Sequence, residues 1–147
     1  MILTGTRQVF LLGTTLLLLA LGACSREPAT GPVEIKWDRD TCTRCSMAIS
    51  DHHYAVEVRG GPKKKAFKFD DVGCAIHWLK DQPWGNDPAT EIWVADYRSG
   101  KWLDARSAHY IAGKTTPMAY GFGATDQAVP GSIDFDEARK QLLAKDK

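Results

Sequence analysis

The alternation of hydrophobic and polar residues in the first half of the chain predicts a β-hairpin. Residues 54–59 alternate between the two classes, as a half-buried strand does. Residues 60–62 are Gly-Gly-Pro, which is typical of a turn, and residues 66–69 have the composition of a returning strand. The three lysines at 63–65 are then expected at the solvated tip of the hairpin.

A helix is expected after this hairpin, and a similar pattern follows in the second half of the chain. Asp70 and Asp71 are suited to capping, and apolar residues recur at helical spacing over roughly the next ten positions. Residues 91–97 and 101–105 flank Arg-Ser-Gly, which predicts a second hairpin. The remaining expected elements are an extended segment over 33–37, a loop over 82–90, short strands over 109–111 and 117–122, and a final helix that begins with the capping-box pattern of Asp134 and Glu137.

These elements predict an α+β fold. A hairpin followed by an acidic Phe-Asp motif and a helix occurs twice, with the motif at 69–71 and again at 135–137. We therefore expect two small related β-hairpin-plus-helix units, about 38–82 and 90–147, packed together in one domain over residues 38–147. The domain is expected to follow a lipidated tether and first extended segment at 24–37.

The N-terminal residues have the pattern of an export signal. A polar start with Arg7 precedes an apolar run at 9–21, which is short for a membrane span. Residues 21–24, Leu-Gly-Ala-Cys, resemble the lipobox of bacterial lipoproteins. We therefore expect a signal peptide over 1–23, and lipidation of Cys24 that anchors the chain to membrane lipid. By resemblance to sorting in Gram-negative bacteria, Ser25 favours the outer membrane, with the domain on its periplasmic face.

Composition narrows the function classes. The chain has 19 Lys and Arg against 18 Asp and Glu, and loss of Arg7 with the leader leaves 18 against 18. A neutral chain without a long basic run is a poor nucleic-acid binder, so no nucleic-acid partner is expected. After residue 23 no apolar run approaches the roughly 20 residues of a membrane-spanning helix.

The sulfur-containing residues suggest the chemistry. Lipidation of Cys24 leaves three cysteines, an odd number that is unusual in an exported protein. Cys42, Cys45 and Met47 form a C-x-x-C-x-M motif, and Met118 lies in a Gly-rich stretch where packing does not explain it. Thiolate and thioether ligands select Cu(I). Auxiliary ligand candidates are His52, and Cys74, whose pKa is expected to be lowered by the start of the helix.

Two other interpretations remain open from the residues alone. Cys42 and Cys45 have the spacing of a redox disulfide, which would make the protein a periplasmic thiol–disulfide oxidoreductase. Cys74 and His77, with two residues between them, are spaced as a second ligand pair for a structural zinc site. Neither alternative accounts for Met47 and Met118, and the copper interpretation does.

Four ordered blocks resemble the NosL family, which consists of lipoprotein copper chaperones associated with maturation of nitrous oxide reductase. The blocks are C-x-x-C-x-M at 42–47, F-x-F-D-D-x-G-C at 67–74, W-V-x-D-Y-x-S-G-x-W-x-D-A at 93–105 and T-P-M-x-Y-G-x-G-A at 116–124. The resemblance implies a non-catalytic protein that binds Cu(I) and delivers it, with periplasmic assembly proteins as partners, to the enzyme's copper-sulfide centre in denitrification.

The same resemblance ranks the metal ligands. Cys45, Met47 and Met118 match the family's ligand positions, whereas Cys42 and Cys74 rank behind them. Ser46 stands where the family usually has Gly between Cys and Met. This departure changes backbone freedom more than ligation.

Overall fold

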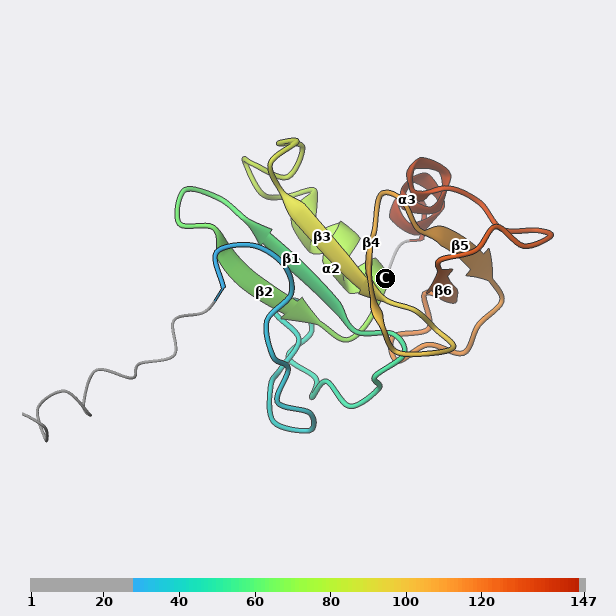
Figure 1. The fold of residues 1–147 in the computed structure, drawn as a ribbon, viewed down its shortest axis with the longest axis horizontal. Helices are drawn as coiled ribbons and strands as arrows, with labels where there is room; N and C mark the ends of the chain where they lie inside the picture. Colours follow the sequence, from blue (N-terminus) through green and yellow to red (C-terminus); the bar gives the residue numbers. More distant parts are fainter. Residues whose placement is uncertain (1–27, 146–147) are drawn as a thin grey trace, which may run out of the picture.

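The fold is known from a computed structural model that describes residues 28–145. The expected signal peptide, the lipidation site Cys24 and the first tether residues lie outside the described residues. The architecture is α+β, as the pattern predicted, with a four-stranded sheet, a two-stranded sheet and two helices among the described residues (Figure 1). Within this part of the chain, neither helix has the length and apolar character needed to cross a bilayer.

The larger sheet is antiparallel and combines the two predicted hairpins. Its strand order is β2-β1-β3-β4, so the hydrogen bonds between β1 and β3 join the hairpins edge to edge. The strands are β1 Val56–Gly60, β2 Lys65–Phe69, β3 Glu91–Ala95 and β4 Trp102–Asp104.

The smaller sheet pairs β5, His109–Ala112, with β6, Phe122–Thr125. The strand expected over 117–122 is wrong, because only Phe122 of that range lies in a strand. Residues 117–119 turn instead, with Ala119 at a positive φ of 56° and its N–H donating to the Thr116 carbonyl at 2.9 Å.

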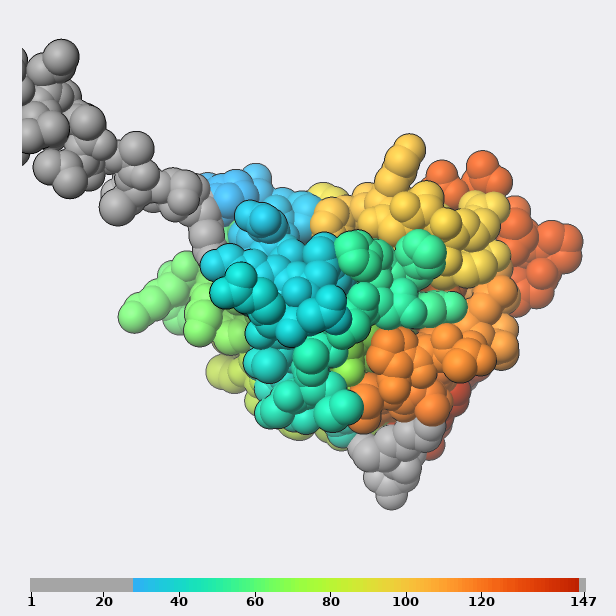
Figure 2. All heavy atoms as spheres, turned by 90° about the horizontal axis from the view of Figure 1, so that it is seen from below, coloured from blue at the N-terminus to red at the C-terminus, as the bar shows by residue number. Residues whose placement is uncertain are grey.

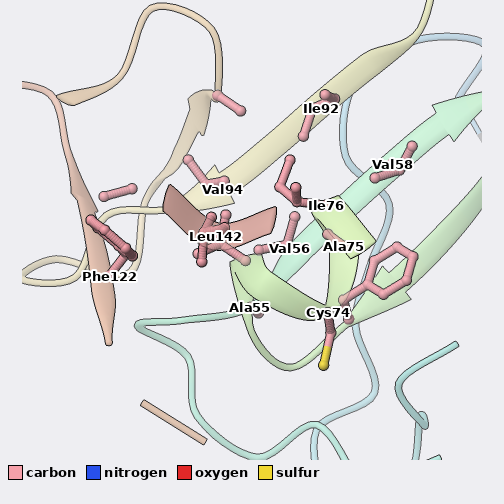
Figure 3. Packing of buried hydrophobic residues seen from close by; sticks show 14 of the residues in the cluster. Ala55, Val56, Val58, Cys74, Ala75, Ile76, Ile92, Val94, Phe122 and Leu142 are labelled. Carbon is pink, nitrogen blue, oxygen red and sulfur yellow. The ribbon is translucent and has the colours of Figure 1, made fainter. Parts of the chain in front are cut away.

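Helix α2, Val72–Leu79, packs on the larger sheet, and α3, Phe135–Leu143, packs against α2 and the smaller sheet. Helix α2 covers the face on which Val56 and Val58 point. Figure 3 shows Ile76 of α2 and Leu142 of α3 grouped with the strand valines. Asp134 caps α3 by accepting from the Glu137 N–H at 2.9 Å, which confirms the predicted start of this helix.

Polar side chains on the opposite face of β1 hold the N-terminal segment. Glu57 accepts a hydrogen bond from the Val33 N–H at 2.7 Å, and Arg59 donates to the Gly31 carbonyl at 3.2 Å. Both side chains are buried by this arrangement. Residues 33–36, where an extended segment was expected, belong to neither sheet. The segment is fixed by side chains of the sheet.

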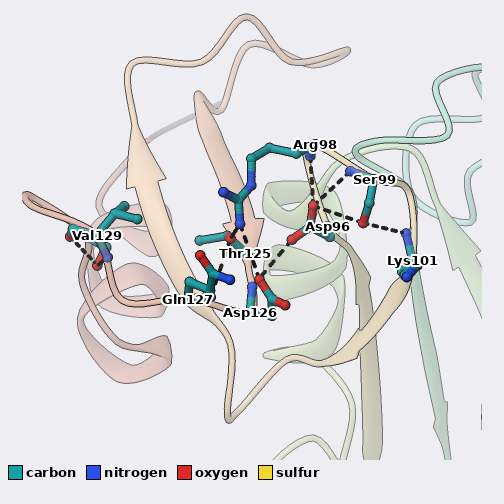
Figure 4. A network of polar contacts seen from close by, with 9 residues as sticks. Asp96, Arg98, Ser99, Lys101, Thr125, Asp126, Gln127 and Val129 are labelled. Carbon is teal, nitrogen blue, oxygen red and sulfur yellow. Dashed lines mark hydrogen bonds and ion pairs between the residues drawn. The ribbon is translucent and has the colours of Figure 1, made fainter.

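A second polar cluster joins the two sheets (Figure 4). Asp96, directly after β3, accepts from the Arg98 and Ser99 N–H groups at 2.9 and 2.8 Å, and from the Asp126 N–H at 3.4 Å. A parallel bridge between Asp96 and Ala124 of β6 adds a backbone link. The β3–β4 turn is therefore connected to the smaller sheet.

Candidate metal centre

Three cysteines and one aspartate converge at the end of the first hairpin. Cys42 and Cys45 come from the loop before β1, Asp70 directly follows β2, and Cys74 lies in the first turn of α2. One ligand atom from each of these four residues lies within 4.8 Å of the other three. Cys42, Asp70 and Cys74 are buried, whereas Cys45 is partly exposed.

The loop that carries Cys42 and Cys45 is fixed by its own backbone. The Cys42 N–H donates to the Met47 carbonyl at 2.8 Å, and the Ser46 N–H donates to the Cys42 carbonyl at 2.9 Å. The Thr43 N–H donates to the Lys68 carbonyl of β2 at 2.8 Å, which fastens the loop to the sheet. Ser46 has φ of 62°, in the left-handed region that favours glycine, which gives a physical reason for the glycine usual at this position.

The size of the cluster suits a metal held by sulfur. With metal–sulfur bonds of about 2.3 Å, three sulfurs in a trigonal arrangement stand about 4 Å apart. The ligand atoms here lie at most 4.8 Å apart, so small side-chain movements are sufficient to bring them around one ion. Cys45 Sγ also lies 3.6 and 3.5 Å from the two carboxylate oxygens of Asp70, which places Asp70 against the thiols.

Proximity and burial shift the pKa values of these groups in different directions. The hydrogen bond from the Cys74 thiol lowers the pKa of Cys42 and favours its thiolate form. Burial raises the pKa of Cys45 to about 11 and the pKa of Asp70 to about 6. Binding of a metal ion by Cys45 must therefore displace a proton.

The expectation that the helix start lowers the pKa of Cys74 is wrong. The pKa of Cys74 is raised, first by its hydrogen bond to Cys42 and then by burial. Cys74 lies in the first turn of α2, but its thiol is buried and donates a hydrogen bond to Cys42. In Figure 3 its sulfur extends from the end of α2, away from the labelled apolar side chains between helix and sheet. Local contacts here outweigh the helix dipole.

A second layer of contacts brings the loop before β6 to the cluster. Arg44 donates to the Tyr120 hydroxyl at 2.9 Å and also interacts with the Cys74 thiol. The Tyr120 ring lies against Gly73, where an added Cβ would stand 1.9 Å from a ring carbon. Figure 2 shows the cyan loop and the orange segment on the same face of the molecule. A guanidinium beside the thiols offsets the negative charge of thiolate ligands.

Only some of the predicted ligands lie in the four-residue cluster. Cys42, Cys45 and Cys74 come together as candidates. Met47 follows Cys45 on the same loop, but its side chain is 58% exposed. Met118 is partly buried, and its N–H donates to the Asp71 carboxylate at 3.1 Å, so its backbone lies beside the start of α2. His52 is stacked on Trp37, with the ring centroids 3.7 Å apart, and is not part of the four-residue cluster.

Asp70 is the member of the cluster that sequence analysis missed. Asp70 and Asp71 were both assigned to capping, but only Asp71 caps α2, by accepting from the Gly73 N–H at 3.0 Å. Asp70 precedes the cap, so its side chain does not have to bind the helix. The sequence signal for its role in the cluster was its position four residues before Cys74. His77, the other half of the zinc alternative, contacts the Leu142 carbonyl at 2.9 Å, between the helices.

A family model, NosL, matches residues 32–129. The chain belongs to the NosL family. The match includes all four residues of the cluster, and it extends from the N-terminal segment held by Glu57 to the loop after β6. A comparison with curated proteins found no similar sequence.

Membership confirms the resemblance drawn from the four sequence blocks and assigns the protein to a family of bacterial copper-binding chaperones. Three sulfurs and one carboxylate are a suitable donor set for copper, because thiolates prefer soft metal ions. The family and the cysteine cluster therefore agree on copper binding.

Proposed function

We propose that this NosL chain carries copper as Cu(I) and delivers it for assembly of the copper-sulfide centre of nitrous oxide reductase. The observation that carries the proposal is the convergence of Cys42, Cys45, Cys74 and Asp70 within 4.8 Å in a NosL chain. Thiolate ligands favour Cu(I), and Met47 and Met118 add thioethers in the same part of the fold.

The exposure of the ligands supports release by ligand exchange. Cys42 and Cys74 are buried, whereas Cys45 is partly exposed and Met47 is strongly exposed. A periplasmic assembly protein approaching this loop meets Met47 and Cys45 first. Copper then moves from the exposed ligands to the partner's ligands while the buried thiols retain their positions. Acyl chains on Cys24 keep the carrier at the periplasmic face of the outer membrane in this proposal.

The test is an anaerobic Cu(I) titration of the chain from Ser25 onward against a chromophoric competitor. We expect tight binding near one Cu(I) per chain, lost in Cys45→Ala and weakened at least tenfold in Cys74→Ala. Asp70→Asn tests the carboxylate, and Asp51→Asn, an exposed aspartate outside the cluster, is its matched control. Failure of the wild-type chain to retain Cu(I) against the competitor would overturn the proposal.

The two methionines are tested separately in the same titration. Met47→Leu and Met118→Leu preserve side-chain size and remove the sulfur. We expect both variants to fold and to bind Cu(I) more weakly. Unchanged affinity in both would remove the methionines from the site and leave the cysteine cluster as the whole of it.

The oxidoreductase alternative rests on the closeness of Cys42 and Cys45. It requires an accessible thiolate to attack a partner's disulfide. Cys42 is 1% exposed, and the pKa of the more accessible Cys45 is raised to about 11, so the pair is poorly arranged for that attack. Turnover of a disulfide substrate by wild type but not by Cys42→Ser, without Cu(I) retention, would favour this alternative.

A further inference from the structure

The turn between β1 and β2 is the most basic feature of the first hairpin. Lys63, Lys64 and Lys65 are consecutive, and all three are exposed. The neighbouring loop packs Trp84 against Gly60 and Gly61 at the base of the turn. That loop also carries the charged residues Lys80, Asp81 and Asp87. The three lysines of the turn outnumber the two acids of that loop.

The N-terminal tether leaves the domain beside this turn. The Arg59 side chain donates through Nε to the Gly31 carbonyl at 3.2 Å and through Nη1 to the Lys64 carbonyl at 3.0 Å. Glu91 also accepts from the Gly31 N–H at 2.7 Å. Arg59 thus links the end of the tether directly to the lysine turn. In Figure 1 the blue start of the described chain and this turn lie on the same side of the molecule.

The length of the tether limits how far the turn can stand from an anchoring membrane. Gly31 lies seven positions after Cys24. A fully extended chain of this length spans at most about 25 Å. An anchor at Cys24 therefore holds the turn within a short distance of the headgroups, where each lysine interacts favourably with anionic lipid.

We propose that Lys63, Lys64 and Lys65 form a docking surface for anionic phospholipid headgroups. The proposal rests on lipidation of Cys24, which is part of the proposed function. It also fixes the orientation of the carrier. Lys65 begins β2 and Asp70 follows its end, so the turn and the metal cluster are separated by about 17 Å of extended strand. Docking of the turn directs the cysteine cluster away from the bilayer.

The first test uses the processed full-length lipoprotein in vesicles. Lysine acylation, followed by mass spectrometry, is compared between phosphatidylcholine vesicles and vesicles that also contain phosphatidylglycerol. We expect acylation of Lys63–Lys65 to slow several-fold on the anionic vesicles and to recover at high salt. Lys101 is the internal control, because it is exposed in the turn at the opposite end of the sheet. Equal acylation on both vesicle types, or protection of Lys101 instead, would overturn the proposal.

The second test measures the contribution of the lysine charges in the absence of the lipid anchor at Cys24. The chain from Ser25 onward retains every residue that the structure describes. Its binding to phosphatidylglycerol vesicles at low salt is measured for K63Q/K64Q and for the matched pair K101Q/K140Q, both exposed. We expect about a 30-fold loss for the first pair and little change for the second. Equal losses in the two pairs contradict a localised surface.

The two proposals fail in different ways. Cu(I) titration of the same lysine variants reports the carrier function, and retention of the lipoprotein on phosphatidylcholine vesicles reports the lipid anchor. Loss of copper binding in the wild type with intact lysine protection overturns only the carrier. Normal copper binding without lysine protection overturns only the docking surface.

Discussion

At the scale of single residues, Gly73 decides how closely the loop before β6 approaches α2. Alanine is a better helix former than glycine by about 1 kcal/mol, so Gly73→Ala would stabilise an isolated helix. Here the added Cβ would stand 1.9 Å from the buried Tyr120 ring. We expect this overlap to outweigh the gain in propensity and to lower the free energy of unfolding by about 2 kcal/mol or more in urea titrations.

Gly113→Ala is the control for this substitution. Its added Cβ would meet no atom within 4 Å, so only its positive φ of 80° is costly. That cost is about 1 kcal/mol. A Gly73→Ala protein as stable as the wild type would show that Tyr120 moves away from α2 without penalty.

Ser46 gives a second prediction at this scale. Its φ of 62° is costly for any residue with a Cβ, so Ser46→Gly removes strain but also adds freedom to the unfolded chain. We expect a net gain of up to about 1 kcal/mol in the free energy of unfolding, and unchanged Cu(I) affinity. Ser46→Val, with a β-branched side chain at the same φ, should be destabilised. If Ser46→Gly loses copper affinity, the loop conformation itself controls the site.

At the scale of elements, Asp71 connects α2 to the segment that carries Met118. One carboxylate oxygen caps the helix at Gly73, and the other accepts from the Thr116 hydroxyl at 2.5 Å and from the Met118 N–H at 3.1 Å. We expect Asp71→Ala to cost about 2 kcal/mol or more and to weaken Cu(I) binding, because both connections are lost. Urea unfolding and the copper titration measure the two effects.

Thr116→Val tests the connection between Asp71 and the Met118 segment separately from the helix cap. It removes the hydrogen bond to Asp71 and the acceptor of the Gly121 N–H, and it leaves the helix cap and the Met118 N–H bond in place. A small loss of stability with unchanged copper binding is expected. Equal copper affinity in Asp71→Ala and wild type would show that this connection does not position the metal ligands.

The elements themselves followed closely from local patterns, whereas the contacts between them did not. Alternation located β1 and β2, and the Asp134 capping pattern located α3, because these signals act within a few residues. The role of Asp70 and the raised pKa of Cys74 depend on Cys42, some 30 residues away in sequence. Contacts between residues so far apart in the chain leave no periodic pattern in the sequence.

At the scale of the whole molecule, acid weakens the joint between the sheets. Burial acts to raise the pKa of Asp96, but hydrogen bonds from the Ser99 and Arg98 backbones outweigh it and lower the pKa. The folded state therefore favours the carboxylate more than the unfolded state does. This contribution is present above the usual pKa of about 4 and is lost as the pH falls below it.

Asp96→Asn should accordingly be about 1 kcal/mol less stable than wild type at neutral pH and should lose less stability on acidification. Chemical denaturation between neutral and strongly acidic pH measures how the free energy of unfolding of each protein changes with pH. Asp81→Asn, an exposed aspartate in the loop after α2, is the control and should follow the wild-type curve. Parallel curves for Asp96→Asn and wild type would contradict the role of this carboxylate.

Copper binding is expected to stabilise the folded chain as a whole. The four cluster residues come from the Cys42–Cys45 loop, the end of β2 and the start of α2, and only folding brings these segments together. An ion bound to the folded state alone raises its stability by about 2.7 kcal/mol when free Cu(I) is 100 times the dissociation constant. For a domain of this size, that corresponds to a rise in Tm of roughly 10 °C. Anaerobic calorimetry should show this rise for wild type and Asp51→Asn, and at most about half of it for Cys74→Ala, whose Cu(I) affinity is expected to fall at least tenfold. An equal rise in Cys74→Ala would place the copper outside this cluster.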